Sequence, residues 1–152
     1  IATPRNAAPI TDAATLAAVE IGPDISVDDT DFAGLLNNLR ISRGTTPVAY
    51  DARLNAAAQK HAADMAVNNY FAHDSLDGRT PLARIRAEAY EPRTYGENIA
   101  GRQQTEEAAL DAWINSPSHN RLLGAANMED FALGVAGTGS RTRWVLLMAT
   151  ER

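Results

Sequence analysis

Cysteine is absent from the 152-residue sequence. Its absence excludes disulfide bonds, thiolate metal ligands and cysteine nucleophiles. Basic residues are also few: 14 Lys and Arg stand against 19 Asp and Glu, which gives a net charge of -5. No segment gathers the Lys and Arg cluster that would neutralise nucleic-acid phosphates. We therefore expect no nucleic-acid partner.

Long apolar runs are missing too. No run approaches the roughly 20 residues that cross a bilayer, so no membrane span is expected. Hydrophobic residues still make up 45% of the sequence, enough for one core in one domain of ordinary size. The sequence begins with Ile1 and not with Met, as expected where an upstream segment has been removed, by a signal peptidase or by design.

Residues 1–30 are rich in Ala, Pro, Asp and Thr and predict an N-terminal arm, followed by a main domain over 31–152. The domain opens on a helical pattern. Asp31 is a candidate N-cap and Gly44 a candidate stop. The apolar residues between them recur at helical spacing: Phe32, Leu35, Leu36 and Leu39.

Three more helices follow from their start signals. Asp51 is the candidate cap of one that ends near Asn68-Asn69, Thr80-Pro81 opens a second, and Thr105 opens a third that runs toward Pro117. The expected buried faces are Leu54, Ala57, Ala58, His61 and Met65 in the first, Leu82, Ile85 and Ala89 in the second, and Leu110, Trp113 and Ile114 in the third.

The pattern changes toward the C-terminus. Phe131, Leu133 and Val135 alternate with small residues, the turn residues 137–140 follow, and residues 144–149 are continuously apolar. This order predicts a β-hairpin whose second strand is covered on both faces. The predicted fold class is therefore α+β, an α-β-α sandwich with a small antiparallel sheet between helical layers.

Polar side chains gather in three islands, residues 71–74, 96–100 and 113–119, which we expect to be loops at the edges of helices. They contain His73, Glu97 and His119. Each has an ordinary structural explanation: a histidine at a helix end caps or faces solvent, and a buried carboxylate accepts hydrogen bonds from its surroundings. His61 lies on an apolar helix face and is expected to be a hydrogen-bonded core residue outside any site.

Several catalytic and ion-binding motifs are missing. Asp74, Asp77 and Gly78 lack the alternating oxygen ligands of an EF-hand. Ser116 and Ser118 flank a proline and form no Gly-x-Ser-x-Gly elbow, and no His-Glu-x-x-His helix or glycine-rich phosphate loop occurs. The three islands thus point to a site without a named reaction.

Taken in order, these islands resemble the CAP superfamily, the cysteine-rich secretory, antigen 5 and pathogenesis-related proteins with an SCP domain, in its cysteine-free bacterial branch. The resemblance runs from about Asp31 to Arg152. It is carried by the segments 35–40, 54–65, 71–78, 96–100, 113–119 and 133–136. It implies an α-β-α sandwich, in agreement with the order of elements above.

In that family a central cleft holds two histidines and usually two glutamates. The resemblance implies that His73 and His119 are metal ligands, that Glu97 is a tentative catalytic group, and that Asn98 and Ser116 line the cleft with it. Ser116 stands where the second glutamate is expected, which removes a charge and is expected to weaken metal affinity. Zinc is the expected cofactor, with calcium or magnesium as alternatives.

Three functions follow from the resemblance. The first is an exported, monomeric domain that binds a divalent ion and a small apolar or cell-envelope ligand without turnover. The second is a metal-assisted peptide or ester hydrolase with Glu97 as general base. The third is a lipid- or sterol-binding protein. The expected location is secreted or periplasmic.

Overall fold

The computed structural model describes residues 29–152, so nearly all of the predicted arm at 1–30 lies outside the described residues. The described chain forms five α-helices, four strands and one short 3-10 turn. In chain order they are α2 (Asp29–Ser42), β1 (Ala49–Tyr50), α3 (Ala52–Asn68), α4 (Pro81–Ala87), β2 (Pro92–Gly101), α5 (Glu106–Ile114), α6 (Pro117–Leu123), β3 (Asp130–Ala136), η1 (Gly139–Arg141) and β4 (Arg143–Glu151).

The strands form one sheet in the order β1-β3-β4-β2. The predicted hairpin of β3 and β4 is confirmed, and β2 pairs antiparallel with the other side of β4. The two-residue strand β1 runs parallel to β3, so the sheet is antiparallel except at this edge. Strand β2 forms the opposite edge, and no second strand within residues 29–152 pairs with its outer side.

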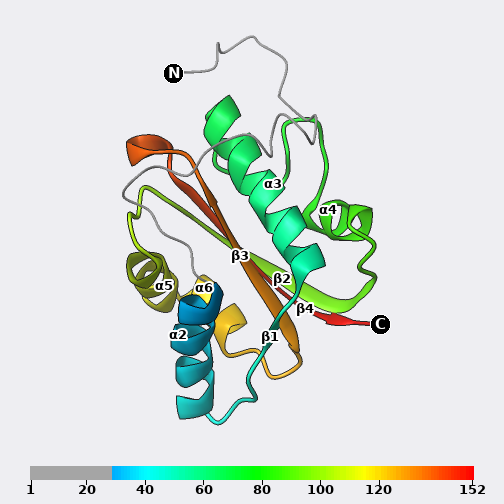
Figure 1. The fold of residues 1–152 in the computed structure, drawn as a ribbon, viewed down its shortest axis with the longest axis vertical. Coiled ribbons are helices and arrows are strands. Elements are labelled where there is room, and N and C mark those ends of the chain that lie inside the picture. Colours follow the sequence, from blue (N-terminus) through cyan, green and yellow to red (C-terminus); the bar gives the residue numbers. More distant parts are fainter. Residues whose placement is uncertain (1–28) are drawn as a thin grey trace.

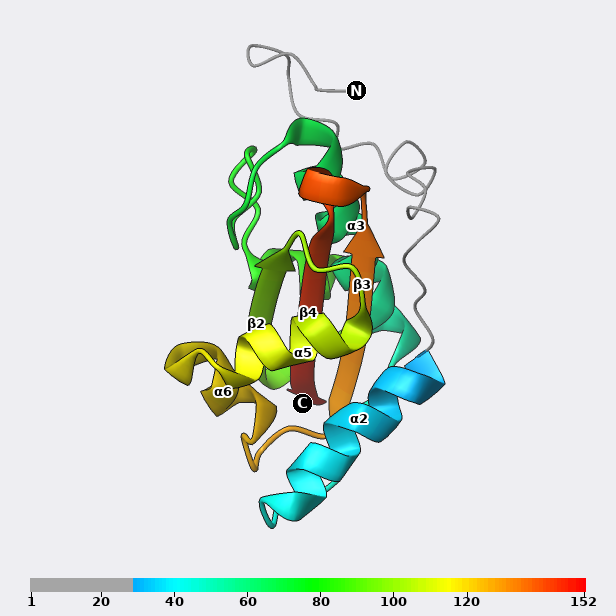
Figure 2. The ribbon, with the colours of Figure 1, turned by 90° about the vertical axis from the view of Figure 1, so that its left-hand side faces the viewer.

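Helices cover both faces of the sheet, as predicted (Figures 1 and 2). Helix α3 packs along one face with α4 beside it, while α2, α5 and α6 cover the other. The core is accordingly divided in two by the sheet. One half contains Leu54, Met65, Ile99 and Leu147, and the other contains Phe32, Trp113, Trp144 and Leu146. Strand β4 contributes to both halves because successive side chains point to opposite faces.

The predicted caps of three helices are confirmed. Asp51, Thr80 and Thr105 each accept hydrogen bonds from backbone N–H groups in the first turns of α3, α4 and α5. Helix α3 ends at Asn68 and is followed by its C-cap residue Asn69, whose left-handed φ of 52° turns the chain away from the helix axis. These caps fix both ends of α3 and the start of α4, and the loop between the two helices contains His73.

Other predictions about the elements were wrong. Asp31 lies inside α2 and does not cap it. Helix α4 ends at Ala87, so Ala89, with φ of 64°, lies beyond the helix and is exposed. Glu97 lies within strand β2 and His119 within helix α6, although both were predicted in loops. No helix in the described part of the chain combines the length and apolarity that a membrane span requires.

Candidate functional site

Glu97 is the most deeply buried acidic group of the predicted site, with only 2% of its side chain exposed. One carboxylate oxygen, Oε1, lies 2.9 Å from Nδ1 of His73. The other, Oε2, accepts a hydrogen bond of 2.9 Å from Nη1 of Arg84, whose side chain is 4% exposed. The buried carboxylate of Glu97 thus has two partners, His73 and Arg84, and each of its oxygens accepts one hydrogen bond.

Three separate elements bring this cluster together. Strand β2 directs Glu97 toward the layer of α3 and α4, on the same side as Ile99. Arg84 comes from α4, and His73 from the loop that joins α3 to α4. Arg84 also donates to the backbone oxygen of His73, so one guanidinium holds both the loop and the carboxylate. We call these three residues the His73 cluster.

The cluster sets the charge of its members. Burial raises the pKa of Glu97, but the hydrogen bond with His73 and the charge of Arg84 outweigh this effect and hold the pKa below its usual value. The hydrogen bond with Glu97 raises the pKa of His73. Because ionised Glu97 can only accept, Nδ1 of His73 must carry the hydrogen. The other ring nitrogen, Nε2, belongs to a side chain that is 50% exposed.

His61 lies behind this cluster and is the hydrogen-bonded core residue that the sequence predicted. Its Nε2 lies 2.8 Å from the backbone oxygen of Ala72, and the side chain is 1% exposed. Burial, followed by the charge of Arg84, lowers the pKa of His61 to about 4. The ring is therefore neutral near pH 7, with Nε2–H donating and Nδ1 as an acceptor.

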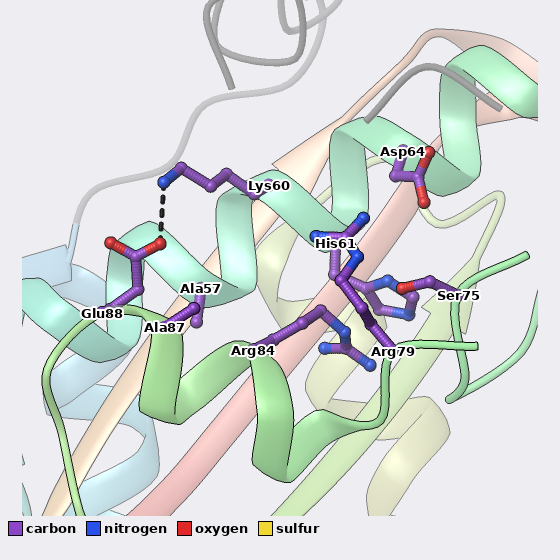
Figure 3. Close-up of a pocket in the computed structure, with 9 residues that line it drawn as sticks. All are labelled: Ala57, Lys60, His61, Asp64, Ser75, Arg79, Arg84, Ala87 and Glu88. Atoms are coloured by element: carbon purple, nitrogen blue, oxygen red, sulfur yellow. Dashed lines mark hydrogen bonds and ion pairs between the residues drawn. The ribbon is translucent and has the colours of Figure 1, made fainter. Parts of the chain in front are cut away.

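His61 and Arg84 both line a cavity of about 30 Å³ (Figure 3). Within residues 29–152, Nδ1 of His61, Nε of Arg84 and Oγ of Ser75 have no hydrogen-bond partner, and all three residues line this cavity. A cavity of this size has room for a water molecule, which can accept from Arg84 and donate to His61. His61 thus stands next to the site, although the sequence analysis left it out.

His119 belongs to helix α6, which contacts strand β2. Asn98, 2% exposed, donates from its amide nitrogen to the backbone oxygen of His119 at 2.9 Å. Because side chains alternate along a strand, Asn98 and Glu97 point to opposite faces. Ser116 occupies the N-cap position of α6 without capping it through its side chain. The structure therefore joins His73 to Glu97 and anchors the main chain of His119 to the same edge strand through Asn98.

The arrangement of the histidine and carboxylate side chains shows which of them fit the expected metal ion. Among the described residues, no three His, Asp or Glu side chains are grouped so that they could hold an ion. Glu97 is already committed to two donors, so it fits a supporting role better than that of a ligand. His73 fits a ligand, because a carboxylate that accepts from one ring nitrogen leaves the other directed outward for a metal.

Arg84 is the member that sequence reasoning missed. The sequence predicted that a buried Glu97 would need a partner, but it did not indicate which of the 14 Lys and Arg residues would provide it. The available signal was weak: Arg84 directly precedes the buried Ile85 in a helix of only seven residues, where it is one of two arginines. The pairing becomes visible only when α4 is packed against β2.

Comparison with known proteins identifies the family to which this chain belongs. Residues 33–148 match the sequence profile of CAP, the Cysteine-rich secretory protein family. The match covers most of the chain, and the chain belongs to this family. It does so without any cysteine, as expected for the bacterial branch.

Individual relatives agree with this assignment. The chain is 29% identical over 133 residues to the uncharacterized Bacillus subtilis protein YkwD, covering 88% of this chain and 52% of YkwD. It is 30% identical over 110 residues to the uncharacterized B. subtilis membrane protein YlbC, covering 72% of this chain and 32% of YlbC. The chain thus spans about half the length of one relative and a third of the other.

Solved structures share the fold. An extracellular protein containing an SCP domain from Bacillus anthracis matches with a TM-score of 0.71 and 28% identity, over 80% of this chain and 40% of that one. An outer surface protein of Borrelia burgdorferi matches with a TM-score of 0.74 and 21% identity, over 83% of this chain and 97% of that one. The second likeness concerns the fold alone.

Proposed function

We propose that this chain is an exported CAP domain that binds a divalent cation, zinc first, through Nε2 of His73 and the imidazole of His119, without hydrolytic turnover. The observation that supports it is the orientation of His73: Nδ1 is held by a buried carboxylate, while the side chain remains half exposed. This arrangement selects the tautomer whose Nε2 carries the free electron pair. Calcium and magnesium are poorer candidates because they prefer oxygen ligands.

The hydrolase alternative is less well supported because it needs Glu97 as a general base. Both oxygens of Glu97 already accept from cationic or N–H donors, and its pKa is held below the usual value. A base in this state has a weak tendency to take a proton from water near neutral pH. We therefore assign Glu97 the role of orienting His73.

Export and the wider ligand are also proposals. The B. anthracis neighbour is described as extracellular, which supports a secreted or periplasmic location for this chain. A small apolar or cell-envelope molecule would bind beside the ion in the same cleft. Lipid or sterol binding remains the alternative for such a ligand, and mass spectrometry of lipids extracted from the purified protein tests it.

Calorimetric titration with zinc tests the proposal. We expect the unaltered protein to bind one equivalent, and His73→Ala and His119→Ala each to weaken binding strongly. Glu97→Gln should weaken it about 10- to 100-fold, the usual effect of losing an outer-shell partner. His61→Gln is the matched control because it removes the remaining histidine but no proposed ligand.

Three results would count against this account. Unchanged zinc affinity in His73→Ala refutes the metal site, and unchanged affinity in His119→Ala removes that residue from it. Cleavage of a peptide or ester library in the presence of zinc, calcium or magnesium, lost in Glu97→Gln, would establish the hydrolase instead.

A further inference from the structure

A second concave region lies at the end of the molecule where α3 finishes. Figures 1 and 2 show the C-terminal end of α3 and the η1 turn at this same end. A groove of about 520 Å³ opens here. We call it the arginine groove, after three of its lining residues, Arg102, Arg141 and Arg143; Asn69, Phe71, Gly101 and Ser140 complete its walls. It shares no residue with the His73 cluster.

The arginines of this groove have no ion-pair partner among the described residues. No ion pair within residues 29–152 includes any of the three arginines, although the whole chain carries a net charge of -5. Arg143 is 7% exposed and donates to the backbone oxygens of Tyr70, Ser140 and Thr142. Burial, then the charges of Arg141 and Arg102, lower the pKa of Arg143. The positive charges of the three arginines thus repel one another in the groove, and a bound anion would offset this repulsion.

Free donors line the groove as well. Arg141 uses one nitrogen, Nη1, to donate to the backbone oxygen of Ala66 at 2.8 Å. The guanidinium of Arg102 makes no hydrogen bond to any described residue, and its side chain is exposed. Its main chain is held on both sides, because its N–H donates to Thr142 and its oxygen accepts from Gln104. The two guanidiniums therefore retain most of their N–H groups for an oxyanion.

The backbone of Arg102 is strained. Its φ is 80°, in the left-handed region that a side chain enters at a cost of about 1–3 kcal/mol. Glycine would adopt this conformation without that cost, and Gly101 stands immediately before it. The fold thus holds an arginine at a position where the backbone favours glycine, and it directs that arginine into the groove.

The groove also offers an apolar surface. Phe71 is 53% exposed, an unusual position for a large aromatic side chain. One edge of its ring packs near Gly101, where an added Cβ would lie 3.6 Å from Cε1 of the ring. The remaining ring surface is open to solvent beside the arginines. An aromatic ring next to guanidinium groups suits a ligand that has both an apolar and an anionic part.

We propose that the arginine groove binds a soluble phosphomonoester that carries an apolar or aromatic group. Its phosphate accepts hydrogen bonds from Arg102 and Arg141, and its apolar part contacts Phe71. Phosphate is favoured over carboxylate because a phosphomonoester carries about -1.5 to -2 charges near pH 7, which compensates three arginines better than one negative charge does. The proposal is independent of the metal site.

Calorimetry or NMR titration with phenyl phosphate, inorganic phosphate and benzoate tests the proposal. We expect phenyl phosphate to bind most tightly. Arg102→Gln should weaken phenyl phosphate binding about tenfold, the value of one charged hydrogen bond. Phe71→Ala should remove the preference for phenyl phosphate over inorganic phosphate. Arg93→Gln, which removes an exposed arginine outside the groove, should leave the affinity unchanged.

A further variant, at Ser140, distinguishes a loss of the binding site from misfolding. Ser140 is exposed, so Ser140→Glu introduces a negative charge at the groove without disturbing the core, and it should abolish binding. Thermal unfolding confirms that each variant is folded. Equal loss in Arg93→Gln and Arg102→Gln, equal affinity for benzoate and phenyl phosphate, no binding by the unaltered protein, or binding that Ser140→Glu leaves intact would each overturn the proposal.

Discussion

Glu97 and Arg84 are both almost completely buried, and each depends on the other. An ion loses several kcal/mol of hydration when it is buried, and only good hydrogen-bond geometry offsets that loss. Here the carboxylate meets Arg84 at 2.9 Å and His73 at 2.9 Å. The cluster therefore fixes the position of the loop that bears His73, because Arg84 also binds the backbone oxygen of that residue.

Replacing Arg84 tests this dependence. Arg84→Met leaves a buried carboxylate with His73 as its remaining partner and should lower the free energy of unfolding by about 3–5 kcal/mol. Arg86→Met is the matched control on the same helix, because the Arg86–Glu91 pair is about half exposed and is worth at most about 1 kcal/mol. Urea unfolding measures both. Equal losses in the two variants would show that the buried pair contributes no more than a surface pair.

His61 predicts a dependence of stability on pH. Its folded pKa of about 4 lies below the ordinary value of 6.5, because burial and Arg84 outweigh the opposing effects of Glu97 and Asp64. Between these values the unfolded chain binds a proton that the folded protein excludes. Stability therefore falls as pH decreases from 6.5 to 4, by up to about 1.4 kcal/mol per pH unit, and this loss is absent above pH 6.5.

The substitution His61→Gln isolates this effect. Glutamine retains an N–H donor for the backbone oxygen of Ala72 but does not titrate. Between pH 7.5 and 5.0, the unaltered protein should lose about 2 kcal/mol more than the variant in urea unfolding, since only about 1.5 pH units of that interval lie below 6.5. Parallel pH profiles for the two proteins would contradict the assignment of a neutral, buried His61.

At the scale of elements, strand β2 and helix α3 organise the site. Strand β2 carries Glu97 on one face and Asn98 on the other, so a single edge strand connects the His73 cluster to helix α6. Helix α3 lies so close to β3 that an added Cβ on Gly134 would be 2.6 Å from the backbone carbon of Ala58. This close approach fixes the layer from which the loop of His73 extends.

The substitution Gly134→Ala tests the close packing of α3 on β3. The new methyl group meets backbone atoms that cannot rotate away, so we expect a loss of about 1–3 kcal/mol or more in unfolding free energy. Gly34→Ala is the control, because nothing lies within 4 Å of an added Cβ there and alanine favours the helix by about 0.5–1 kcal/mol. If Gly134→Ala were as stable as the unaltered protein, the described spacing of the two elements would be incorrect.

The helices with clear caps were predictable, and strand β2 and helix α6 were not. Asp51, Thr80 and Thr105 satisfy local backbone groups, so their signals lie in a few neighbouring residues. Strand β2 contains glycine and charged residues in place of alternating apolar ones, and its pairing with β4 makes it a strand. Helix α6 has only seven residues, too few for a periodic pattern.

At the scale of the whole molecule, the sheet separates two apolar cores and places polar groups around its β2 edge. The sequence identified the family and two members of the His73 cluster, since His73 and Glu97 lie in recognisable motifs. It did not predict Arg84, because the partner of Glu97 depends on how α4 packs against β2. It also did not predict the arginine groove, whose arginines come from segments about 40 residues apart in sequence.

The most direct test of the proposed function is anomalous X-ray scattering at the zinc edge from crystals soaked in zinc. The account predicts a peak beside Nε2 of His73, with Glu97 still bonded to Nδ1 and to Arg84, and loss of the peak in His73→Ala. A peak on the Glu97 carboxylate with Arg84 displaced, or no peak near His73 at saturating zinc, would contradict it.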